Sequence, residues 1–125
     1  MAKKTIDFDV VRDSALALPD VKETTIHGTL CFKLHGKLLT CQALDKSVEP
    51  NTLAVRIDFD QRAELLATDP SVYYVTDHYM NYPTVLVRLS RIDRSSLRDL
   101  LAIAWRFVSS RTKKTRRSQH RGKSE

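Results

Sequence analysis

Two stretches of alternating polar and apolar residues, 30–34 and 37–43, are separated only by His35 and Gly36. Period-two alternation predicts strands, and a two-residue connection with a glycine predicts a tight hairpin turn in which Gly36 has a positive φ. Strands joined this closely must be antiparallel, because a parallel pair needs a crossover of about a dozen residues or more. The hairpin therefore predicts an antiparallel sheet as the basis of the fold.

The two cysteines both fall within this hairpin. A regular pairing places Phe32 and Leu34 on the same face as Leu39 and Cys41, because alternate residues of a strand share a face. Cys31 then lies on the other face, so the two thiols are expected to point apart and not to bridge. Two cysteines in 125 residues are also too few for a disulfide framework.

Aspartates mark the expected starts of three helices. Asp7 and Asp93 each precede an apolar stretch of helical spacing, and Asp58 or Asp60 precedes a shorter one. Pro19 ends the first helix, because the residue before a proline avoids helical geometry. The expected elements are a helix over 6–18, strands over 30–34, 37–43 and 52–57, a helix to about 67 with Ala63 and Leu66 on one face, strands over 72–75 and 84–89, and a helix from 93 to about 111.

These elements predict an α+β fold with two layers. The order along the chain is helix, three strands, helix, two strands, helix, and about five strands form one antiparallel sheet. The apolar stripes of the helices would cover one face of the sheet and leave the other partly exposed. A chain of 125 residues is the size of one domain, which we assign to residues 1–111, followed by a basic tail over 112–125.

The charge is distributed unevenly along the chain. Residues 1–110 contain 14 Lys and Arg against 14 Asp and Glu, whereas residues 111–125 contain seven basic residues and one acidic residue. The domain is therefore neutral, and the whole net charge of +6 lies at the C-terminal end. The end has no apolar periodicity, so we expect it to be disordered in isolation.

A resemblance to a known family rests mainly on DPSVYYVTDHYMNYPTVLVRL (residues 69–89), supported by ALALPDV (15–21), FKLHGKLL (32–39) and the apolar stripe over 97–105. This pattern resembles the MmcQ/YjbR family of small bacterial proteins. The resemblance implies a CyaY-like or secretion-chaperone-like two-layer fold and a DNA-binding role through a double-wing arrangement. Thr84 departs from the pattern, because such sequences often carry a tryptophan there.

DNA is the partner that the resemblance and the charge both favour. Flexible basic segments bind phosphates without reading base sequence. Lys33, Arg56 and Arg88 would add further phosphate contacts from the exposed face of the sheet. No base-reading helix is recognisable. The candidate phosphate contacts at the C-terminal end are Arg111, Lys113, Lys114, Arg116, Arg117, Arg121 and Lys123.

Two other functions remain open. A protein-binding or homodimeric module would expose an apolar patch, for which Leu38, Leu86 and the tyrosine cluster are candidates. A small-ligand binder or enzyme would use a pocket, for which the candidates are Tyr74, His78, Tyr79 and Tyr82.

Several kinds of chemistry are not expected. The sequence has no G-x-S-x-G, no HExxH and no Cys/His signature, so we predict no enzyme activity and no cofactor. His27, Cys31 and His35 lie too far apart along an extended strand to meet at one metal ion. The N-terminus has no apolar segment typical of a secretory signal, and no apolar run has the length of a membrane span, so a cytoplasmic protein is expected.

Overall fold

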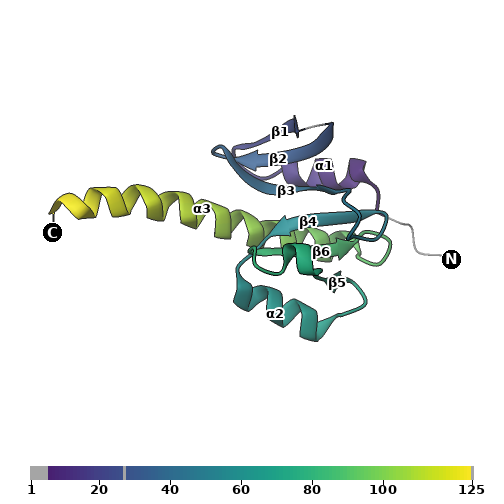
Figure 1. The fold of residues 1–125 in the computed structure, drawn as a ribbon. Coiled ribbons are helices and arrows are strands. Elements are labelled where there is room, and N and C mark those ends of the chain that lie inside the picture. Colours follow the sequence, from purple (N-terminus) through teal and green to yellow (C-terminus); the bar gives the residue numbers. More distant parts are fainter. Residues whose placement is uncertain (1–5, 27, 125) are drawn as a thin grey trace.

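The computed structural model describes residues 6–26 and 28–124, with side chains as far as Ser110, and it is an α+β domain (Figure 1). Six strands form one antiparallel sheet in the order β1-β2-β3-β4-β6-β5. The elements are α1 (Phe8–Leu16), β1 (Val21–Ile26), β2 (Thr29–Leu34), β3 (Lys37–Ala43), β4 (Thr52–Arg56), α2 (Phe59–Thr68), β5 (Tyr73–Tyr74), the 3-10 turn η1 (Asp77–Tyr79), β6 (Thr84–Arg88) and α3 (Arg94–Ser124).

The main core lies between one face of the sheet and the helices α1 and α3. Leu53 and Val55 of β4 and Val85 and Val87 of β6 are fully buried there, as the alternation in these strands predicts. Leu97 of α3 packs against the same cluster, while α2 lies against β5 and β6. The predicted two-layer α+β architecture is therefore confirmed, with helices on one face and a second face that they do not cover.

The helix starts follow the predicted caps. The Asp7 side chain accepts a hydrogen bond from the backbone N–H of Val10, and the Asp58 side chain accepts one from that of Gln61. Asp93 Oδ1 accepts from the N–H of Ser96 at 2.7 Å. These bonds satisfy amides that have no partner within the first helical turn. Asp58, not Asp60, therefore begins the second helix.

The hairpin contains an irregularity that alternation does not reveal. His35 and Gly36 both have positive φ, as a tight two-residue turn requires. The register shifts between Phe32 and Lys33, so that Cys31 lies directly opposite Cys41. The expectation that the two cysteines point to opposite faces is therefore wrong, because a β-bulge places one extra residue on one strand and reverses the faces beyond it.

The sheet has one strand more than expected. Val21–Ile26 forms β1, which pairs along its length with β2 at the edge of the sheet. Most of its side chains are exposed, so it lacks the apolar alternation that marks an internal strand. Asp20 has a φ of 62° and turns the chain from α1 into this strand. Backbone pairing with β2, not burial of side chains, explains the strand.

The last helix is longer than expected. α3 continues to Ser124, and its final part, coloured yellow in Figure 1, extends beyond the sheet. The side chains of 111–125 lie outside the described residues, so the disordered tail over 112–125 stays a prediction about the chain in isolation. Among the described residues we find no helix with the length and hydrophobicity that crossing a bilayer requires.

Candidate nucleic-acid interface

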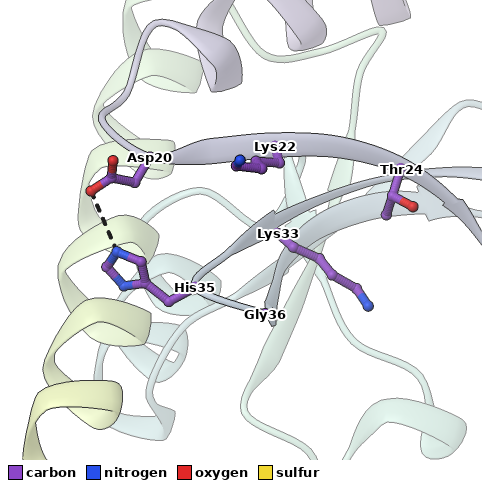
Figure 2. A pocket seen from close by; sticks show the side chains of 6 residues that line it. All are labelled: Asp20, Lys22, Thr24, Lys33, His35 and Gly36. Carbon is purple, nitrogen blue, oxygen red and sulfur yellow. Dashed lines mark hydrogen bonds and ion pairs between the residues drawn. The ribbon is translucent and has the colours of Figure 1, made fainter.

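The face of the sheet that the helices leave open carries a hollow with a volume of about 380 Å³. Lys22 of β1 and Lys33 of β2 are directly opposite each other in the strand pairing. Figure 2 shows the two side chains leaving these neighbouring strands, with the β2–β3 turn at one end of the hollow. The lining residues are Asp20, Lys22, Thr24, Lys33, His35 and Gly36. We call this site the basic hollow.

Lys22 and Lys33 of the basic hollow are not paired with acidic side chains among the described residues. The nearby Asp20 instead faces His35, with 3.4 Å between Oδ2 and Nε2 (Figure 2). Two cations directly opposite each other on adjacent strands repel. An anion seated between the lysines would relieve this repulsion.

The other two predicted cations of this face have different surroundings. Arg56, at the end of β4, lies opposite Thr84 in the pairing with β6 and lines a second pocket. Arg88 is already engaged: its guanidinium binds both carboxylate oxygens of Glu49, at 2.9 and 2.8 Å, and lies 4.3 Å from the centre of the Tyr74 ring. Arg88 is therefore less available to a phosphate than Lys33, which forms no ion pair among the described residues.

The second pocket has a volume of about 220 Å³ and lies beside η1. Three of the four residues predicted to form a pocket, His78, Tyr79 and Tyr82, are brought together here. The full lining is Leu38, Cys41, Ala54, Arg56, His78, Tyr79, Tyr82 and Thr84. We call it the tyrosine pocket.

A hydrogen bond holds one wall of the tyrosine pocket. The Tyr79 hydroxyl donates to Asp45 Oδ1 at 3.2 Å, and His78 Nε2 lies 3.9 Å from Oδ2 of the same carboxylate. Burial and the adjacent Asp45 raise the pKa of Tyr79 to about 12. Burial alone would raise the pKa of Asp45, but hydrogen bonds from Ser47 and Tyr79 and the nearby His78 lower it overall. The phenol is therefore neutral at physiological pH and acts as a donor.

Tyr74 has a structural position outside this pocket. Its hydroxyl oxygen accepts a hydrogen bond from the backbone N–H of Glu49 at 2.9 Å and lies 2.7 Å from Oγ1 of Thr52. Leu86 lies beside it in the strand pairing and is fully buried in a small cluster that Val48 and Tyr79 cover. The expectation that Leu86 contributes to an exposed apolar patch is therefore wrong, because Val48 of the connection between β3 and β4 and Tyr79 of η1 cover that part of the sheet.

Arg62 is the residue of this region that sequence reasoning missed. It is only 8% exposed and its guanidinium donates to the backbone carbonyls of Met80, Tyr82 and Thr84 at 3.0, 3.0 and 3.2 Å. Burial lowers its pKa from the usual arginine value. One cation thus fixes the segment that forms the wall of the tyrosine pocket.

The spacing of residues along α2 indicates that Arg62 lies on the buried face of the helix. Arg62, Leu65 and Leu66 are at positions i, i+3 and i+4 and so share one face of α2. Ala63 was expected to face inward but is exposed, and Arg62 takes the buried position next to it. An arginine on the apolar side of a helix therefore indicated a buried cation with backbone acceptors.

Cys31 and Cys41, which lie opposite each other on β2 and β3, are expected to be unreactive in the folded protein. Both are free thiols, and burial together with the neighbouring Cys31 raises the pKa of Cys41 to about 12. Since the thiolate is the nucleophile, alkylation by iodoacetamide at pH 8 should be at least about tenfold slower in the native protein than in denaturant. Mass spectrometry of quenched time points measures both rates. Equal rates would contradict the protection of the buried Cys31 and the partly buried Cys41 by the fold.

The raised pKa of Cys41 also makes the stability of the protein depend on pH. The folded-state pKa of about 12 lies above the ordinary thiol value of about 8.5, so the native chain retains a proton that the unfolded chain loses. The contribution of the Cys41 thiol to the free energy of unfolding is therefore complete below about pH 8.5, and it falls as the pH rises toward 12. Denaturation curves at two pH values check this direction.

The fold and its open face define a class of small α+β proteins with helices on one side of an antiparallel sheet and a basic, tyrosine-bordered surface on the other. The family model described as YjbR matches residues 16–107. The chain belongs to the YjbR family, and the resemblance seen in residues 69–89 is confirmed.

Other proteins are similar to this chain in part of the sequence or in the fold. The uncharacterized proteins Rv2570 of Mycobacterium tuberculosis and Mb2600 of Mycobacterium bovis are each 46% identical to this chain over 41 residues, which are 33% of this chain and 32% of the relative. The matched part thus spans about a third of these relatives. The crystal structure of Deinococcus radiodurans protein DR2400, with the domain DUF419, aligns with a TM-score of 0.69 and 22% identity over 87% of this chain and 83% of that chain. This likeness shows the fold.

Proposed function

We propose that this protein binds DNA through its phosphates, without reading the base sequence and without catalysing a reaction. The observation that carries the proposal is the Lys22–Lys33 pair, because two lysines without an ion-pair partner among the described residues share one hollow on the open face of the sheet. A phosphate diester supplies the negative charge that would stabilise this pair. Phosphate contacts of this kind position a protein on DNA without specifying a sequence.

The helix that leads to the basic end of the chain passes close to Arg56. Phe107 and Val108 of α3 line a small pocket together with Lys37, Leu38 and Arg56. Arg111 follows Val108 by about one turn of helix, so the backbone of α3 leads from this small pocket into the segment that contains the seven basic residues. A duplex that contacts the open face would therefore meet this segment as well.

A salt titration of the double variant Lys22→Gln, Lys33→Gln tests the proposal. The logarithm of the binding constant for duplex DNA falls linearly with the logarithm of salt concentration, with a slope of about −0.9 for each phosphate contact. Because the two lysines share one phosphate, the variant should lose about 0.9 units of slope and bind more weakly at every salt concentration. Fluorescence anisotropy of a labelled duplex with the full-length chain gives both values.

A matched variant separates local contacts from net charge. Arg94 and Arg98 are exposed on α3, on the helical side of the sheet, and their replacement by glutamine also removes two charges. This control should leave the slope within about half a unit of that of the original protein. Equal slopes for both double variants would show that the hollow makes no phosphate contact, and absence of binding at low salt would end the proposal.

A further inference from the structure

Tyr82 presents an aromatic ring to solvent at the rim of the tyrosine pocket. The residue is 57% exposed, whereas Tyr73 of β5 packs into the main core and is only 7% exposed. An exposed ring beside a cation offers a flat stacking surface, and proteins bind single-stranded nucleic acid without sequence preference by stacking bases on aromatic rings and placing cations along the backbone. The pocket therefore combines the two features that such binding requires.

The interior of the pocket suits one small flat group. Its volume of about 220 Å³ is below the range of about 300–1,000 Å³ that is common for drug-sized ligands. Leu38 and Ala54 supply an apolar surface, while His78 and Thr84 supply polar groups. A nucleobase has the same combination of an apolar ring face and polar edges.

The walls of the pocket are already in position. Arg62 holds the carbonyls of Met80, Tyr82 and Thr84, and Asp45 holds the Tyr79 hydroxyl. The His78 ring packs edge-on against the Tyr79 ring, with 5.0 Å between the centroids. A site that is fixed before binding loses little conformational entropy when a ligand enters.

Cations and the pocket lie along one line across the sheet. Lys33 on β2 pairs with Leu38 on β3, and Leu38 also lines the tyrosine pocket. Arg56 lies on β4, two strands or about 10 Å from β2. A single strand crossing the sheet could therefore contact the basic hollow with one phosphate and Arg56 with another.

We propose that the tyrosine pocket receives an unpaired base of single-stranded DNA, which stacks on Tyr82 while the flanking phosphates contact Arg56 and the Lys22–Lys33 pair. This inference rests on the proposed function and makes it narrower, since it requires a base that is free of the duplex. Paired bases cannot enter the pocket, so a duplex uses only the phosphate contacts.

The test compares three labelled probes of equal length with the full-length protein at one salt concentration: a thymidine oligomer, the same strand without bases, and a duplex. The thymidine strand should bind at least about fivefold more tightly than the strand without bases. Tyr82→Ala should weaken binding of the thymidine strand by at least about fivefold and leave the other two probes unchanged. Tyr82→Phe keeps the stacking surface and should bind like the original protein.

The outcomes separate the two proposals. If Tyr82→Ala binds the thymidine strand as tightly as the original protein does, the base site is wrong, while binding of the duplex would leave the proposed function standing. If none of the probes binds at low salt, both proposals fail. Tyr82 is largely exposed, so its replacement should not unfold the chain, and a circular dichroism spectrum checks this.

Discussion

Replacing the seven basic residues of 111–125 with glutamine should reduce the salt dependence of DNA binding by about 6 units of slope, because each lost phosphate contact removes about 0.9. The change takes the net charge of the chain from +6 to −1, because seven positive charges are removed, whereas the neutral domain before it remains intact. Glutamine is also a good helix former, so the substitution does not itself favour unfolding of α3. Anisotropy titrations of a labelled duplex with the full-length variant measure the slope.

The size of the loss shows which contacts the basic segment makes. A variant in which only Lys113 and Lys114 are replaced should lose about 2 units, if the contacts are independent. A loss well below 6 units for the sevenfold variant would mean that only some of the charges reach phosphates. An unchanged slope would assign DNA binding to the folded domain alone.

Arg62→Met should lower the free energy of unfolding by about 2–4 kcal/mol, a large effect for one substitution. The side chain of methionine fills a similar space but donates no hydrogen bond. The carbonyls of Met80, Tyr82 and Thr84 would then lose the donor that the guanidinium provides. Urea denaturation followed by circular dichroism measures the loss.

Two further variants identify the cause. Arg62→Lys retains a cation but cannot reach three diverging carbonyls in the same way, so we expect an intermediate loss. Glu64→Met, at an exposed position of the same helix, should change stability by less than about 0.5 kcal/mol. If Arg62→Met were as stable as Glu64→Met, the carbonyls would have to find water, and Arg62 would not organise the wall of the pocket.

Local patterns predicted most of the framework. The hairpin turn at His35 and Gly36, the helix caps and the inward faces of β4 and β6 depend on interactions within a few residues or on a strict period of two. Such features are visible in the sequence because the same residues that form the element also determine it. The antiparallel direction of the sheet followed from short connections for the same reason.

Features that depend on a neighbouring strand were not predicted. β1 was missed because its stability comes from backbone hydrogen bonds to β2, which leave no mark on its side-chain pattern. The bulge in the hairpin was missed because one extra residue on one strand does not alter composition or spacing. It moved Cys31 opposite Cys41 and so reversed the expected relation of the two thiols.

By itself the sequence determined the fold class, the family and the separation of a neutral domain from a basic C-terminal end, since these follow from periodicity, motif and charge. Only the tertiary structure decided which side chains share a site. Lys22 became the partner of Lys33 through strand pairing, and Arg62 reached the Met80–Thr84 segment across the domain, through contacts between residues far apart in the chain. No local pattern encodes such contacts, because each depends on where the other elements come to lie.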